Sequence, residues 1–203
     1  MRSFAITIAI GIGIGIGSVT VLAACAHGTG GTPIANRGTT GPTGDVRAVD
    51  WQNHTYTLDT YGPIKVTSGR GEFPLVSDDD GNVVDTGEIR GSLAVQPALF
   101  ADLDGDGVED AIISSVLGTG GTGQFSQIQI FTTRAGKLVE LGGIPGGDRG
   151  DGGIRHVAVD GRAEIVERNV LVEGDGLCCP SSSRRERWVW RDGEMVQHGG
   201  NAR

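Results

Sequence analysis

The sequence predicts a mostly β domain with antiparallel strands and little helix, arranged as a sandwich or a barrel of about eight to ten strands. Three observations lead to this prediction. First, 36 of the 203 residues are glycine, and each glycine inside a helix costs about 1 kcal/mol relative to alanine. Second, several segments alternate apolar and polar residues with the period of two that strands have. Third, no segment of about ten residues or more keeps the i, i+3, i+4, i+7 apolar spacing of a helix without Gly or Pro.

The alternating segments place the expected strands along the chain. The hairpins are the most definite, because an Asp-Gly pair between two alternating runs favours a tight turn. Such a turn lies at Asp160-Gly161 within residues 154–172, and another lies at Asp192-Gly193 within residues 185–198. Single expected strands are 46–59, 64–69, 111–117 and 125–133. The sequence has no repeat of about 20–50 residues, so a propeller or solenoid built from this chain alone is not expected.

Residues 1–24 have the features of an export signal rather than of a core element. One positive charge, Arg2, precedes an apolar stretch that ends in small residues. Residues 22–25, Leu-Ala-Ala-Cys, resemble the lipobox of bacterial lipoproteins, which implies cleavage before Cys25 and lipidation of Cys25. The alternative is an uncleaved anchor, since about 20 apolar residues can span a bilayer. Both interpretations place the rest of the chain at the cell membrane, facing outside the cytoplasm.

Residues 25–44 are expected to form a flexible tether, and residues 45–203 the extracytoplasmic domain. The tether is rich in Gly, Thr and Pro and lacks apolar periodicity, so it cannot bury a core. The formal net charge is −8 at pH 7, and an acidic chain repels phosphate backbones. The expected partners are therefore the membrane, through the lipid anchor, and an envelope protein or a small ligand, but not nucleic acid.

The stretch DLDGDGVED, residues 102–110, is a candidate calcium loop. Its alternate aspartates can curl onto one focus, the seventh residue can offer its backbone carbonyl, and Gly107 at the sixth position permits the sharp turn. Position 12 is Ile113 rather than the bidentate Glu of an EF-hand, and the residues after it look like a strand instead of a helix. The candidate ligands are Asp102, Asp104, Asp106, Val108 and Asp110.

Residues 100–113, FADLDGDGVEDAII, resemble the calcium loop between strands in FG-GAP, integrin-type repeats. The resemblance implies a structural calcium ion held by the four aspartates and the Val108 carbonyl. The motif occurs once, so the propeller of those repeats does not follow from it. The alternative is a solvated acidic turn, although four carboxylates within nine residues repel one another unless a cation neutralises them. Without a bidentate Glu, the expected affinity is about 10⁻⁴–10⁻³ M, as in extracellular modules.

If Cys25 is lipidated, Cys178 and Cys179 are the remaining cysteines. An oxidising compartment allows them to form a vicinal disulfide. The Cα atoms of neighbours lie about 3.8 Å apart, below the roughly 4.4–6.8 Å of ordinary disulfides, so such a bridge is strained and easily reduced. Two free thiols are the second alternative, and an intermolecular bond or a metal is the third.

The C-terminal residues 157–195 resemble the end of some actinobacterial surface lipoproteins of the LppP/LprE type. They share a strand, a loop with Cys-Cys-Pro-Ser, an Arg-rich strand and an Asp-Gly turn, in that order. The resemblance implies a cell-envelope protein of poorly defined role, and it adds no catalytic residue.

The function expected from the sequence is that of a non-enzymatic binding or structural module with a structural calcium loop. Nucleophile-elbow, zinc-protease and paired-carboxylate motifs are missing from the sequence, so no catalytic residues are predicted. Two alternatives stay open. One is a redox-active envelope lipoprotein that uses Cys178 and Cys179, and the other is an envelope hydrolase without a recognisable motif. Trp188 and Trp190 share a strand face, where they either pack in the core or bind a sugar or partner.

Overall fold

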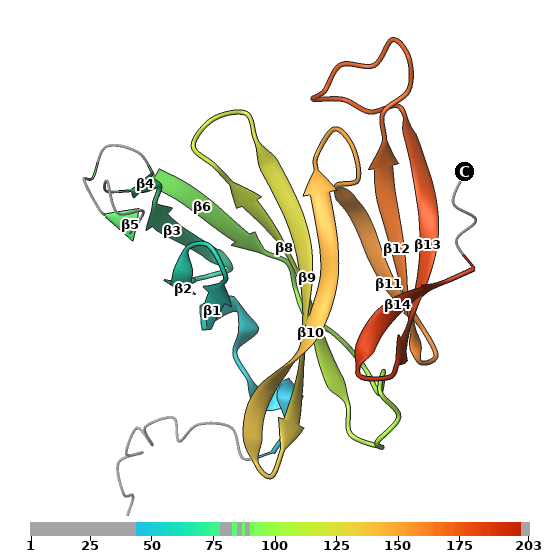
Figure 1. Cartoon of the computed structure of the whole chain (residues 1–203). Helices are drawn as coiled ribbons and strands as arrows, with labels where there is room; N and C mark the ends of the chain where they lie inside the picture. The colour runs from blue at the N-terminus through green and yellow to red at the C-terminus, as the bar shows by residue number, and fades with distance from the viewer. Residues whose placement is uncertain (1–43, 78–82, 85–86, 88–89, 200–203) are drawn as a thin grey trace, which may run out of the picture. The chain divides into compact units, whose positions relative to one another are not determined.

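The computed structural model describes residues 44–77, 83–84, 87 and 90–199 of the chain. The expected export signal, Cys25 and residues 25–43 of the expected tether lie outside the described residues. The mostly antiparallel β class is confirmed: the described part contains fourteen strands, two short 3-10 helices and no α-helix (Figure 1). More strands are found than the eight to ten expected, because several strands have only two to five residues. Among the described residues, no helix is both long and apolar enough to cross a membrane.

A six-stranded antiparallel sheet forms the centre of the fold. Its order is β10-β9-β8-β6-β3, with β7 also paired to β8. The bounds of its strands are β3 Arg70–Pro74, β6 Arg90–Val95, β7 Leu99–Ala101, β8 Asp110–Gly118, β9 Gln124–Arg134 and β10 Lys137–Asp148. Long strands β8 and β9 pair along most of their length, from Ala111 opposite Phe131 to Gly118 opposite Gln124. The predicted strands at 111–117 and 125–133 thus form two long inner strands of this sheet.

The two predicted hairpins make up a second, four-stranded sheet of order β11-β12-β13-β14. Its strands are β11 Ile154–Asp160, β12 Ala163–Val170, β13 Ser182–Arg191 and β14 Glu194–His198. Asp192 and Gly193 both have positive φ, 54° and 92°, between the paired residues Arg191 and Glu194. This is the two-residue turn that Asp-Gly favours. In the first hairpin, Asp160 pairs with Ala163, so Gly161 and Arg162 form its turn.

The expected strand at 46–59 is largely wrong. Two 3-10 helices, η1 Val46–Ala48 and η2 Trp51–Asn53, precede the short strand β1 Thr55–Leu58, which pairs with β2 Gly62–Lys65. Local polar contacts outweigh the alternating pattern, because the Asp45 side chain accepts a hydrogen bond from Arg47 N at 2.8 Å and caps η1. The remaining described strands are the two-residue pair β4 Val76–Ser77 and β5 Val83–Val84.

Two hydrophobic clusters cover opposite faces of the central sheet, so the described strands form a sandwich with an additional thin layer. One cluster joins the sheet to η1, η2 and the β1–β2 hairpin; its members include Val46, Trp51, Tyr56, Ile64, Leu93, Ala111, Ile113 and Phe131. The other joins it to the four-stranded sheet; its buried members are Ala101, Leu103, Ile112, Ile128, Ile130, Ile144, Val166 and Met195. Trp188 and Trp190 pack against this second cluster, which favours the core role for that pair.

A charged group is buried between the two large sheets. The Arg168 guanidinium donates to Glu186 Oε2 at 2.6 Å, to Gly152 O at 2.9 Å and to Pro145 O at 2.7 Å. Glu186 also accepts hydrogen bonds from Arg184 at 2.8 Å and from the indole of Trp188 at 3.0 Å. Burial alone would raise the pKa of Glu186, but these hydrogen bonds hold it below its ordinary value. Arg168 thereby links β12 to β10, through Pro145, and to the connection between β10 and β11, through Gly152.

A second carboxyl group between these sheets has no such partner. Glu164 lies two residues before Val166 and therefore on the same inward face of β12. Its side chain is fully buried, and neither carboxyl oxygen has a hydrogen-bond partner. Burial raises the pKa of Glu164 to about 8, although the positive charge of Arg168 opposes the rise. Glu164 is consequently protonated in the folded protein at neutral pH.

Candidate metal site

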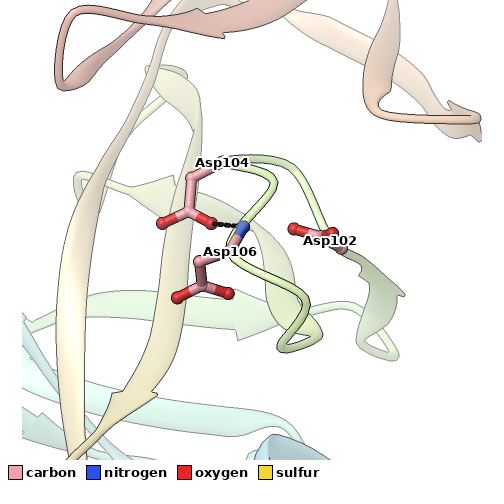
Figure 2. Close-up of side chains that lie close together, drawn as sticks. All are labelled: Asp102, Asp104 and Asp106. Atoms are coloured by element: carbon pink, nitrogen blue, oxygen red, sulfur yellow. Dashed lines mark hydrogen bonds between the residues drawn. The ribbon is translucent and has the colours of Figure 1, made fainter.

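The acidic loop, residues 102–109, connects β7 to β8 at one end of the central sheet. Figure 2 shows the side chains of Asp102, Asp104 and Asp106 gathered around the turn of this loop. One carboxylate oxygen from each of the three lies within 4.8 Å of the others, so this triad could hold a metal ion. Gly105 and Gly107 have φ of 79° and 88°, a backbone conformation that favours glycine. The alternation of aspartate and glycine therefore produces the curl that the sequence predicted.

The loop is held in shape by its own carboxylates. Asp102 accepts hydrogen bonds from the backbone N–H groups of Gly105 at 2.7 Å and Gly107 at 3.3 Å. Asp104 accepts one from Asp106 N at 3.1 Å, and Asp106 accepts one from Val108 N at 2.7 Å. These are the local side-chain turns that aspartate forms readily. They fix the conformation in which the three carboxylates lie close together.

Asp110, the fourth predicted carboxylate ligand, occupies a separate position. It begins β8 and is fully buried, and its Oδ2 accepts a hydrogen bond from Leu103 N at 2.9 Å. Its Oδ1 has no hydrogen-bond partner. Burial raises the pKa of Asp110, and the negative charge of Asp104 adds to the rise, while the polar groups of Thr132 and Leu103 oppose it. Three of the predicted carboxylates are therefore brought together, while Asp110 is outside this cluster and closes the loop by its hydrogen bond with Leu103.

Val108, predicted to contribute its carbonyl, lies on the outer side of the loop. Its side chain is 38% exposed, and its N–H is bound to Asp106. Among the described residues, no hydrogen bond to the Val108 carbonyl is found. Its contribution to an ion site is still a prediction.

Cationic side chains from distant parts of the chain flank the acidic loop. Arg134, at the end of β9, lies 3.4 Å from Asp104 Oδ2. The guanidinium of Arg162, from the β11–β12 turn, covers Gly105 so closely that a Cβ atom there would overlap it. On the other side, Arg47 of η1 holds Glu109 through two hydrogen bonds of 2.5 and 2.8 Å. Sequence reasoning missed all three arginines, because only tertiary packing brings them to the loop.

Cys178 and Cys179 are joined by a disulfide in the connection between β12 and β13. Both residues are exposed, and Cys179 N donates to Gly176 O at 2.9 Å. The base of this connection is closed by Asp175, whose carboxylate accepts from Ser181 N at 2.9 Å and from Val172 N at 3.1 Å. These bonds lower the pKa of Asp175. The result is an exposed, closed turn in which the disulfide faces solvent.

Comparison of the chain with protein-family models, with curated proteins and with solved structures finds no match.

Proposed function

We propose that this chain is a lipid-anchored protein of the cell envelope that acts as a binding or structural module, stabilised by calcium in the acidic loop. The observation that carries the calcium assignment is the triad of carboxylate oxygens within 4.8 Å of one another. The Leu-Ala-Ala-Cys sequence at residues 22–25 supports the lipid anchor. The module is proposed to be non-enzymatic, with the membrane and either an envelope protein or a small ligand as partners.

Calcium suits the acidic loop better than magnesium does. Calcium accepts six to eight oxygen ligands in flexible geometry, whereas magnesium prefers to keep its waters. Asp106 is exposed, so water ligands could complete the coordination on its side, whereas the Asp104 side chain is only 7% exposed. The buried Asp110 is not counted among the ligands here, because it lies outside the triad and burial raises its pKa.

A calcium ion here would have to compete with Arg134. The Arg134 side chain is 57% exposed and lies 3.4 Å from Asp104, whose own side chain is only 7% exposed. An ion would therefore have to displace or share Asp104 with Arg134, and the attraction between a divalent ion and three carboxylates is what would favour this exchange. The role of the ion would be structural, because the loop joins β7 and β8 beside buried Leu103.

The test is a calcium titration of the full chain, followed by its melting temperature. With a dissociation constant near 10⁻⁴ M, about 10 mM calcium should stabilise the folded state by roughly 2–3 kcal/mol and raise the melting temperature by several degrees. Asp104→Asn together with Asp106→Asn should abolish this rise, because two of the three ligand carboxylates lose their charge.

The matched control is Asp59→Asn together with Asp192→Asn, which removes two exposed aspartate charges elsewhere. This control should keep the full calcium response. An equal calcium response in both double variants, or no response in the unmodified chain at about 10 mM calcium, would contradict the proposed site.

A second candidate function, redox activity, is favoured by the exposed disulfide of Cys178 and Cys179. If the binding or structural module is correct, Cys178→Ser with Cys179→Ser should leave calcium-dependent melting within about 1 °C of the unmodified response, since the disulfide lies outside the acidic loop. A thiol count under native and reducing conditions tests the alternative. Reversible two-electron chemistry that requires both cysteines would support the redox function instead.

A further inference from the structure

A cleft opens between the two large sheets, where β8 faces the start of β11. Its volume is about 430 Å³, within the roughly 300–1,000 Å³ of small-molecule sites. One part of its lining is apolar and belongs to or packs against the second hydrophobic cluster: Leu99, Ile112, Ile154 and Val157. The other part is polar: Gln96, Ser114, Ser126, Arg155 and His156.

The cleft exists because small hydroxyl residues replace large apolar ones on the inner face of the central sheet. Ile112 and Ile128 fill the space between the sheets. Two residues further along β8 the inward position is Ser114, and two residues earlier on β9 it is Ser126. The Ser126 hydroxyl accepts a hydrogen bond from Ile154 N at 2.6 Å, which fixes the start of β11 across the gap. Serine is too small to fill the space that isoleucine fills next to it.

An irregularity in β11 places two basic side chains along the cleft. Ile154 pairs with Arg168 while His156 pairs with Glu167, so Arg155 is an extra residue without its own partner on β12. Such a bulge changes the direction of the neighbouring side chains and is common beside functional sites. Arg155 and His156 both line the cleft, although consecutive residues of a regular strand point to opposite faces.

The polar lining has unused hydrogen-bonding capacity. Within the described part of the chain, the Ser114 hydroxyl, the side-chain amide of Gln96 and the His156 ring have no protein hydrogen-bond partner, and Gln96 and His156 are exposed to solvent. Arg155 has one ionic neighbour there, Glu167 at 4.0 Å, which is longer than a hydrogen bond. None of the described carboxylate residues lines the cleft. Arg155 is thus the permanently charged residue of the lining, and its side chain is 55% exposed.

We propose that this cleft binds a small amphiphile with one anionic head group and a short hydrocarbon chain. The head, a carboxylate or a phosphate, would bind Arg155 with help from His156 and Ser114. The hydrocarbon would lie against Leu99 and Ile112. This inference deepens the proposed binding role and rests on it, but it does not depend on the calcium loop.

The test is equilibrium dialysis of radiolabelled octanoate against the full chain in a non-ionic detergent. Arg155→Gln should weaken octanoate binding at least tenfold, because the head group loses its charged hydrogen-bond donor. Arg191→Gln is the matched control, because it removes an exposed charge on the same sheet outside the cleft, and its affinity should be unchanged. Ser114→Leu, which fills the cleft and keeps its charge, should also abolish binding, with a melting curve to verify folding.

Competition experiments identify the head group. Displacement of octanoate by octyl phosphate would support a phosphate source, and its failure would support a carboxylate. If octanol competes as well as octanoate does, the cleft does not recognise the anionic head group. If inorganic phosphate competes as well as octyl phosphate does, the cleft does not bind the hydrocarbon chain. Equal octanoate affinity in the unmodified chain and in Arg155→Gln would overturn the proposal altogether.

The same assay separates this proposal from the calcium proposal. The Asp104→Asn/Asp106→Asn chain should bind octanoate with unchanged affinity. Octanoate binding in a chain that shows no calcium response would support the cleft while contradicting the calcium loop. A normal calcium response without octanoate binding would overturn the proposed amphiphile binding and leave the calcium proposal standing.

Discussion

Replacing Glu164 with glutamine should stabilise the protein at pH 9 by on the order of 4 kcal/mol, and by almost nothing at pH 4. Glu164 is fully buried between the sheets, and both of its carboxyl oxygens lack partners. Its pKa is raised from 4.5 to about 8 by burial. Glutamine has nearly the same shape as the protonated side chain but cannot ionise.

The effect of pH on stability depends on whether the folded or the unfolded chain holds the proton of Glu164. Below pH 4.5 both the folded and the unfolded chain carry a protonated Glu164, so the residue favours neither state through ionisation. Between pH 4.5 and about 8 the folded chain keeps a proton that the unfolded chain releases. The free energy of unfolding therefore falls as pH rises through this window. In the glutamine variant this decline should disappear.

The measurement is urea unfolding of both chains at pH 4, 7 and 9. Glu194→Gln is the control, because Glu194 is an exposed glutamate at the start of β14, and its stability should follow that of the unmodified chain. If the Glu164→Gln and unmodified chains show parallel pH dependence, the carboxyl group is solvated and the buried, unpartnered position described above is wrong.

Replacing Arg168 with methionine should destabilise the protein by about 3–5 kcal/mol, because it leaves a buried carboxylate without its main partner. Glu186 would keep hydrogen bonds only from Arg184, whose side chain is 58% exposed, and from Trp188. The carbonyl oxygens of Gly152 and Pro145 would lose their guanidinium donor as well. Urea unfolding at pH 7 measures the loss.

A double-mutant cycle shows how much of this loss comes from leaving the Glu186 carboxylate without Arg168. Arg168→Met with Glu186→Met should recover a large part of the lost stability, because an apolar pair of similar size can replace a buried ion pair. Arg187→Met is the control, since its pair with Asp160 is exposed and should contribute no more than about 1 kcal/mol. A cost of Arg168→Met as small as that of Arg187→Met would contradict the buried pair.

Local chemistry made much of the fold predictable from the sequence. The Asp192-Gly193 turn needs two residues of positive φ, which Asp-Gly supplies, and the alternating runs on either side set the register. Residues 46–53 also alternate, yet they form 3-10 helices because the Asp45 cap and the hydrogen bond from the Trp51 indole to Val46 O at 2.9 Å decide the local conformation. The alternation of apolar and polar residues contains no information about such contacts.

Part of the candidate site could be predicted from the sequence in the same way, and part could not. Asp102, Asp104 and Asp106 come together through hydrogen bonds within a few residues, so their spacing was sufficient to predict that they gather. Asp110, predicted as a fourth carboxylate ligand, is outside this cluster, because it is buried at the start of β8. Arg134 and Arg162 reach the loop from other hairpins, and no sequence spacing encodes their approach. The cleft depends on where Ser114 meets the bulge at Arg155, which is a property of the packed sheets alone.

The ion pair between Arg47 and Glu109 has a mechanical consequence. Arg47 belongs to η1, the first described element, and Glu109 is the last residue of the acidic loop before β8. A pulling force applied to the chain before residue 45 would enter the domain at η1, where buried Val46 and the Arg47–Glu109 pair connect this element to the rest of the fold. Both side chains of the pair are about half exposed, so the pair would yield first and the buried contacts of Val46 would carry most of the load.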